Sequence, residues 1–122
     1  MEEQPKVAIY EMTPFLRWVR KNRLTPAVEK LKDELRENPD TGDVIPGGSG
    51  LRKVRMGGLG RGKQGGFRVI YFLTLNRTIA VLLTGYSKSE REDLTAEEVR
   101  DFAAQLDAIT ATLAVPPPEE EP

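Results

Sequence analysis

The sequence predicts an α+β fold in which helices pack on one face of a small antiparallel sheet. Two Thr-Pro pairs, Thr13-Pro14 and Thr25-Pro26, each open a stretch whose apolar residues recur at helical spacing. Three β-prone segments follow, and a capping box formed by Thr95 and Glu98 then opens a last amphipathic helix. Together with a short strand near the N-terminus, these observations give the order β-α-α-β-β-β-α.

The N-terminal part is expected to form this strand and a helical hairpin. Residues 6–11 are β-prone and alternate in polarity, which predicts the strand. Thr13-Pro14 reads as an N-cap followed by proline in the first turn, and the helix is expected to end near Arg23. The second helix is expected to run from Thr25-Pro26 to the stop signal Asn38-Pro39.

The middle of the chain is expected to form the rest of the sheet. We predict strands over 51–56, 67–75 and 78–84, a loop over 40–50 and a glycine-rich loop over 57–66. The strand over 67–75 is apolar on both faces apart from Arg68, which is typical of a central strand. Asn76-Arg77 supply a tight turn before the next strand.

After the capping box, apolar residues continue at spacings of three and four as far as Leu113. Residues 1–114 are therefore expected to form a single domain, which suits a chain of 122 residues. Residues 115–122 are rich in proline and glutamate, cannot pack a core and are expected to be a disordered tail.

The composition excludes several kinds of chemistry. The chain has no cysteine, which rules out disulfides and thiolate metal sites, and no histidine, the commonest general base and metal ligand. We therefore expect neither a metal nor a cofactor. No apolar run reaches the ~20 residues of a membrane span, and the acidic start MEEQPK lacks the apolar region of a signal peptide. These features predict a cytoplasmic protein.

Charge is distributed unevenly along the chain. Residues 44–89 contain eight Lys or Arg and no Asp or Glu. Subtracting these eight from totals of 18 basic and 19 acidic residues leaves 10 basic and 19 acidic residues elsewhere, a net charge of −9. A middle region of +8 predicts a polyanionic partner that binds at one place on the molecule.

The glycine-rich loop contains the spacing Gly57-x-x-x-x-Gly62-Lys63, which is similar to a phosphate-binding P-loop. That motif requires Ser or Thr next, to hold a magnesium ion, and a helix immediately afterwards. Here the next residue is Gln64 and a strand is expected to follow. A nucleoside triphosphate site is therefore not expected.

The basic residues are predicted to gather at one end of the sheet. The set comprises Arg52, Lys53 and Arg55 on one strand, Arg61 and Lys63 on the glycine-rich loop, Arg68 on the central strand and Lys88 after the last strand. A charge within an apolar strand is costly unless it serves a pocket, a partner or an ion pair, so Arg68 has a structural alternative in a salt bridge to a helix carboxylate. For Arg52, Lys53 and Arg55 the structural alternative is a soluble strand edge. For Arg61 and Lys63 it is a flexible surface loop. Tyr71 and Tyr86 are candidates for stacking on bases or supplying a hydroxyl, and the structural alternative for each is packing in the core.

Three segments, GDVIPGGSGLRKVR, GRGKQGGFRVIYF and LLTGYSKSEREDLTAEEV, resemble the RelE/ParE toxin superfamily, most closely its HigB-like branch. The resemblance spans roughly residues 7–102 and is most specific over 42–94. It implies a RelE-like fold and the toxin of a type II toxin–antitoxin system. Such a toxin enters the ribosomal A site and inhibits translation by cleaving mRNA, as an mRNA interferase.

The resemblance also implies roles for individual residues. The basic strand pair of the family maps onto Lys53 and Arg55, the arginine in the pattern aromatic-Arg-x-x-Tyr onto Arg68, and the basic residue after the last strand onto Lys88. In a metal-independent reaction the 2′-hydroxyl attacks the adjacent phosphate, and clustered cations stabilise the transition state. Arg55 and Arg68 are the candidate phosphate clamp, Lys53 the candidate base among crowded cations, and Lys88 or Tyr86 the candidate acid. The C-terminal catalytic tyrosine of RelE itself has no counterpart after Tyr86.

Two partners follow from the resemblance. One is the ribosomal A site with its mRNA, for which Arg52, Arg61, Lys63 and Tyr71 are further contact candidates. The other is a cognate antitoxin, expected to carry an acidic or amphipathic segment and a helix-turn-helix DNA-binding domain. Two alternatives remain: a ParE-like toxin that poisons DNA gyrase, which the dense basic cluster disfavours, and a non-catalytic RNA-binding module.

Overall fold

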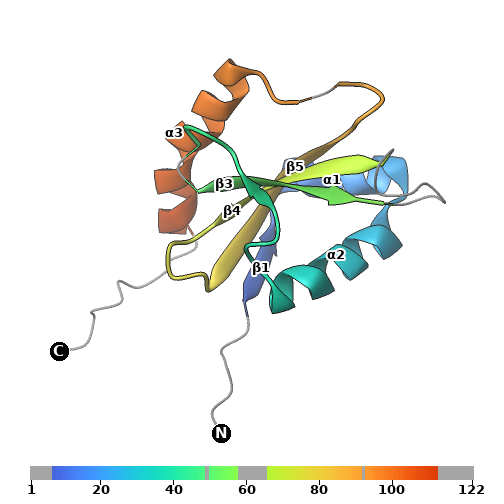
Figure 1. The fold of residues 1–122 in the computed structure, drawn as a ribbon, viewed down its shortest axis with the longest axis horizontal. Helices are drawn as coiled ribbons and strands as arrows, with labels where there is room; N and C mark the ends of the chain where they lie inside the picture. The colour runs from blue at the N-terminus through green and yellow to red at the C-terminus, as the bar shows by residue number, and fades with distance from the viewer. Residues whose placement is uncertain (1–6, 49, 58–65, 92, 113–122) are drawn as a thin grey trace, which may run out of the picture.

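A computed structural model describes residues 7–48, 50–57, 66–91 and 93–112. Within them the chain forms β1 (Ala8–Glu11), α1 (Thr13–Asn22), α2 (Thr25–Glu37), β2 (Asp43–Val44), β3 (Leu51–Met56), β4 (Phe67–Leu73), β5 (Ile79–Ser87) and α3 (Ala96–Thr112) (Figure 1). The α+β class is confirmed. The predicted tail over 115–122 lies outside the described residues, as do most of the glycine-rich loop and its two basic residues, Arg61 and Lys63.

The strands form one five-stranded sheet in the order β1-β5-β4-β3-β2. The pairs β2–β3, β3–β4 and β4–β5 are antiparallel, as expected, but β1 pairs with β5 in parallel. Parallel pairing requires a long connection, and the helical hairpin and three strands between β1 and β5 supply it. The prediction of a wholly antiparallel sheet is therefore wrong at this edge.

Helices cover both faces of the sheet, not one (Figure 1). On the first face, Phe15 of α1 and Leu31 of α2 pack in one core cluster with Val69 of β4. On the second face, Leu106 of α3 packs in another cluster with Ile70 of β4. Because β4 is buried along nearly its whole length, with neighbouring side chains on opposite faces, each face needs its own cover. The apolar character of residues 67–75 already indicated a strand buried on both faces.

The helix starts agree with the predictions to within one residue. Thr13 and Thr25 are the first helical residues and not N-caps; no side chain caps either helix, and proline lies in the first turn of each. The capping box of α3 is confirmed, because the Glu98 N–H donates to Thr95 Oγ1 at 3.1 Å and the Thr95 N–H donates to Glu98 Oε1 at 2.8 Å. No helix in the described ranges is long and apolar enough to cross a bilayer.

Two connections differ from the prediction. The loop expected over 40–50 contains the short edge strand β2, whose Asp43 and Val44 pair with Lys53 and Arg52 of β3. Strand β5 continues to Ser87, past the predicted end at residue 84. The turn at Asn76-Arg77 is confirmed: Arg77 has φ of 62° and its N–H donates to the Thr74 carbonyl at 2.8 Å.

Tyr71 fastens the segment after α2 to the sheet. Its side chain is fully buried in the cluster under α1 and α2. Its hydroxyl donates to the Pro39 carbonyl at 2.8 Å and accepts the Gly42 N–H at 3.0 Å. Gly42 leaves room for this contact, because a Cβ there would lie 2.9 Å from the Tyr71 hydroxyl oxygen. The hydroxyl therefore satisfies two backbone groups just before β2.

Substituting Tyr71→Phe should lower the free energy of unfolding by about 1–3 kcal/mol, because it leaves a buried carbonyl and a buried N–H without their partner. Urea denaturation checks this, with Tyr10→Phe as the matched control. Tyr10 is 41% exposed, so its loss should change stability by less than about 0.5 kcal/mol. Equal effects for the two variants would contradict this account of Tyr71.

Candidate functional site

Strand register places three of the candidate catalytic residues in one row. Arg55 of β3 lies opposite Arg68 of β4, and Arg68 lies opposite Tyr86 of β5. Directly opposed residues of antiparallel strands share a face, so these three side chains emerge on the same face. Lys53, two residues before Arg55, joins them. This is the face that α3 covers, since Tyr86 belongs to the α3 core cluster.

A bulge in β5 brings Tyr86 to that face. Ile70 pairs with Thr84 while Tyr71 pairs with Leu82, so Leu83 is an extra residue in the ladder. Strict alternation would place Leu82 and Tyr86 on the same face, but they belong to different core clusters. The bulge therefore turns Tyr86 towards Arg68, as bulges near functional sites commonly do.

The row opens into a depression of about 540 Å³. It is lined by Lys53, Arg55, Arg68 and Lys88, together with Glu34, Thr41, Asp43, Val54 and Asp93. The structure thus brings together four of the five candidate catalytic residues, and the fifth, Tyr86, contacts the lining residue Asp93. Four of the seven basic residues expected to gather at one end of the sheet thus line this depression.

Arg68 occupies the most enclosed position of the four cations that line the depression. Only 7% of the residue is exposed, whereas Arg55 beside it is exposed. The Arg68 Nη1 donates to the Phe67 carbonyl at a long 3.5 Å. A buried guanidinium that faces a depression holds donors available to an anion that enters it.

Carboxylates enter this cluster although residues 44–89 contain none. Lys53 Nζ lies 2.9 Å from Asp93 Oδ2, and the Tyr86 hydroxyl donates to Asp93 Oδ1 at 3.4 Å. Burial and the neighbouring Asp93 carboxylate raise the pKa of Tyr86 to about 12. Burial acts to raise the pKa of Asp93, but the hydrogen bonds from Lys53 and the Leu94 N–H outweigh it and hold this pKa below its ordinary value. The Lys53 side chain thus directs its Nζ at a carboxylate, a contact that suits a positively charged group.

Arg91 connects this cluster to the start of α3. Its guanidinium donates to the Asp93 carbonyl from Nε at 3.2 Å and from Nη2 at 3.1 Å. It pairs with Glu98, the capping-box residue of α3, and lies over the Tyr86 ring at 5.3 Å from the centroid. Arg91 thus links the Asp93 backbone to Glu98 in the first turn of α3.

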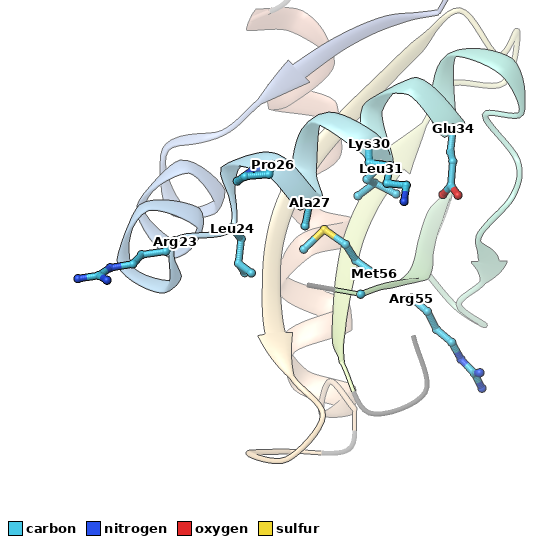
Figure 2. A pocket seen from close by; sticks show the side chains of 10 residues that line it. Arg23, Leu24, Pro26, Ala27, Lys30, Leu31, Glu34, Arg55 and Met56 are labelled. Atoms are coloured by element: carbon cyan, nitrogen blue, oxygen red, sulfur yellow. The ribbon is translucent and has the colours of Figure 1, made fainter. Parts of the chain in front are cut away.

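A second, more apolar cavity of about 340 Å³ lies between α2 and the end of β3 (Figure 2). Leu31 and Met56 contribute to its apolar wall, and it shares Arg55 and Glu34 with the basic depression. Figure 2 shows the Arg55 side chain extending away from Leu31 and Met56. Arg55 therefore stands at the boundary between an apolar surface and a charged one.

Comparison with known proteins identifies the family. Residues 7–114 match the family described as the RelE toxin of the RelE/RelB toxin–antitoxin system. The chain belongs to the RelE toxin family. It is therefore a toxin of a toxin–antitoxin system, and toxins of this family pair with a RelB-type antitoxin.

Solved structures support the fold of this RelE-family toxin. The chain is similar to a mutant of the Escherichia coli toxin RelE in the free state, with a TM-score of 0.56 and 15% identity over 83% of this chain and 97% of that one. It is also similar to the toxin–antitoxin complex RelBE2 of Mycobacterium tuberculosis, with a TM-score of 0.52 and 21% identity over 67% of this chain and 98% of that one. At these identities the likeness shows the fold alone.

Two of the predicted contact residues of this RelE-family toxin have structural partners instead. Tyr71 is buried on the opposite face and hydrogen-bonded to backbone, which agrees with its structural alternative of a core tyrosine. Arg52 Nη1 donates to the carbonyls of Gly42 at 2.7 Å and Asp40 at 3.2 Å, which ties it to the segment before β2.

Sequence reasoning missed Asp93. Its only sequence signal is its place immediately before Leu94 and the capping box, which does not reveal that the carboxylate reaches across to β3.

Substituting Asp93→Asn should lower the Tyr86 pKa from about 12 towards, but not to, its ordinary value near 10, because burial persists when the carboxylate charge is lost. Titrating tyrosinate absorbance checks this, with Tyr86→Phe to assign the transition and Asp101→Asn as the charge-matched control on the exposed side of α3.

The raised pKa of Tyr86 also makes the free energy of unfolding depend on pH. Because the folded pKa lies above the unfolded one, the unfolded chain loses its phenolic proton first. This contribution to stability is complete below pH ~10 and is lost as the pH rises through about 12. An unchanged Tyr86 transition in Asp93→Asn would show that the hydroxyl and the carboxylate do not interact.

Proposed function

We propose that this toxin is a ribosome-dependent mRNA endonuclease of the HigB-like branch, which inhibits translation by cleaving mRNA in the ribosomal A site. The observation that carries the proposal is the convergence of Lys53, Arg55, Arg68 and Lys88 on one depression beside Tyr86. The reaction is attack of a ribose 2′-hydroxyl on the adjacent phosphate with departure of the 5′-hydroxyl. It needs no metal, because the protein's own cations face the phosphate.

The cations are suited to the charge that develops during this reaction. The phosphate gains negative charge on its oxygens as the 2′-oxygen bonds to phosphorus, so fixed cations stabilise the transition state more than the ground state. Arg68, held in place by burial, and Arg55, at the exposed mouth, together clamp the phosphate. Lys53, which lies 2.9 Å from Asp93 Oδ2, adds a third positive group.

The leaving 5′-oxygen requires a proton. Tyr86 retains its hydroxyl proton at every physiological pH, because its pKa is raised to about 12, and Lys88 presents an ammonium to the same depression. These two remain the candidate acids. Comparing Tyr86→Phe with Lys88→Gln distinguishes them, since only the true donor limits the departure of the 5′-oxygen.

An exposed cationic site must be covered while the toxin is idle. The family pairs with RelB-type antitoxins, and we extend this to an antitoxin whose acidic or amphipathic segment covers the depression and whose remaining domain, a helix-turn-helix, binds DNA. Charge complementarity across such a contact would make association strongly salt-dependent.

Substituting Arg68→Ala should reduce cleavage of ribosome-bound mRNA by about 100-fold or more, the usual effect of removing one group that stabilises a developing anion. Arg68→Lys should be intermediate, because an ammonium cannot make the bidentate contact of a guanidinium. Primer extension on programmed ribosomes reads the cuts, thermal melting verifies folding, and Arg100→Ala, on the exposed side of α3, is the matched control.

Cuts within codons that require ribosomes and disappear in Arg68→Ala would support the proposal. Growth arrest without any cuts would instead favour a toxin that poisons gyrase. Neither cuts nor arrest would leave an RNA-binding module.

A further inference from the structure

The Asp93 carboxylate contacts two of the candidate catalytic groups at once. Its Oδ2 pairs with Lys53 Nζ at 2.9 Å, and its Oδ1 accepts the Tyr86 hydroxyl at 3.4 Å and the Leu94 N–H at 2.9 Å. We propose that Asp93 is the general base of the cleavage reaction, taking the proton from the attacking 2′-hydroxyl. This inference rests on the proposed endonuclease function.

The reaction needs a proton acceptor, and the other candidate catalytic groups do not supply one. Lysine and arginine side chains carry their protons at neutral pH and have no acceptor in that form. Tyr86 keeps its hydroxyl proton, and the chain has no histidine. Asp93 is ionised at neutral pH. Glu34 and Asp43 also line the depression, and Asp93 is distinguished by its contacts with both Lys53 and Tyr86.

Asp93 retains room for a substrate hydroxyl. An ionised carboxylate has about four lone-pair positions, and Lys53, Tyr86 and the Leu94 N–H take three of them in the described part of the chain. The remaining position is on Oδ2, which Lys53 shares. The side chain is 54% exposed and lines the depression, so a ribose can approach it.

The step balances without a further reactant. The proton of the 2′-hydroxyl moves to Asp93 Oδ2 as the 2′-oxygen bonds to phosphorus, and the bond from phosphorus to the 5′-oxygen breaks. The 5′-oxygen takes a proton from Tyr86 or Lys88. The products are a 2′,3′-cyclic phosphate and a 5′-hydroxyl end. Asp93 then returns its proton to solvent, and the acid, Tyr86 or Lys88, regains one from solvent.

Lys53 couples phosphate binding to the basicity of Asp93. In the free toxin, Lys53 holds the pKa of Asp93 down although burial opposes this. A phosphate that draws Lys53 away removes that contact and makes the carboxylate a better acceptor as the substrate arrives. The groups in contact with Asp93 are Lys53 from β3, Tyr86 from β5 and Arg91 from its own segment. The same depression is lined by three further cations and two carboxylates, Arg55, Arg68, Lys88, Glu34 and Asp43.

The decisive experiment is single-turnover cleavage of ribosome-bound mRNA as a function of pH, with binding to programmed ribosomes measured separately. Asp93→Asn preserves the Oδ1 acceptor and the shape of the side chain while removing the base. It should lower the cleavage rate at saturation by about 10²–10⁴-fold, leave binding within a few-fold, and lose the acidic limb of the pH–rate profile. Asp93→Glu should retain part of the activity, and formate should partly restore cleavage by Asp93→Gly.

Asp101→Asn removes one charge from an exposed position on α3 and should cleave as wild type does. Cleavage by Asp93→Asn within about threefold of wild type would overturn the base assignment. A large loss that keeps the acidic limb and resists rescue by formate would overturn it as well, because it would mark a purely positional role. Failure of the wild type itself to cut mRNA would instead overturn the proposed function, and the inference with it.

Discussion

The register between β4 and β5 decides which groups meet in the basic depression. Upstream of the bulge at Leu83, strict alternation places Leu82 under the helical hairpin. Downstream of it, the same alternation resumes one residue out of step, and Tyr86 comes to lie beside Arg68 on the α3 side. One extra residue therefore converts what would be a core tyrosine beneath α1 into a partner of the buried arginine.

Gathering cations at the end of a small sheet carries an electrostatic cost that the structure offsets locally. Like charges opposed across strands repel, and Arg55 faces Arg68 directly. Asp93 partly compensates from outside the sheet by pairing with Lys53, and Arg91 holds the Asp93 backbone while pairing with the capping-box Glu98. The start of α3 is thus part of the electrostatics of the depression, beyond its role in covering the second core cluster.

The sequence predicted well whatever depends on local chemistry. Thr-Pro pairs, the capping box and strand alternation located the helices and most strands, and the alternation of Lys53 with Arg55 gave their common face. Contacts between distant segments escaped it: nothing local marks Leu83 as a bulge, aligns β1 parallel to β5, or brings Asp93 to Lys53. Tyr71 was ambiguous for the same reason, because its two backbone partners come from the segment after α2.

The first face of the sheet supports the depression from behind. In the row next to Arg68 and Tyr86, Val69 lies opposite Gly85, and a Cβ at Gly85 would lie 2.3 Å from the Trp18 ring. Glycine there lets Trp18 press against β5, where its ring also meets Phe67 edge-on at 5.8 Å between centroids. Because protein interiors are close-packed, neighbouring residues cannot absorb a small displacement and pass it on to the residues beyond them. A larger residue at 85 would therefore disturb the alignment of Arg68 with Tyr86 without touching the charged groups themselves.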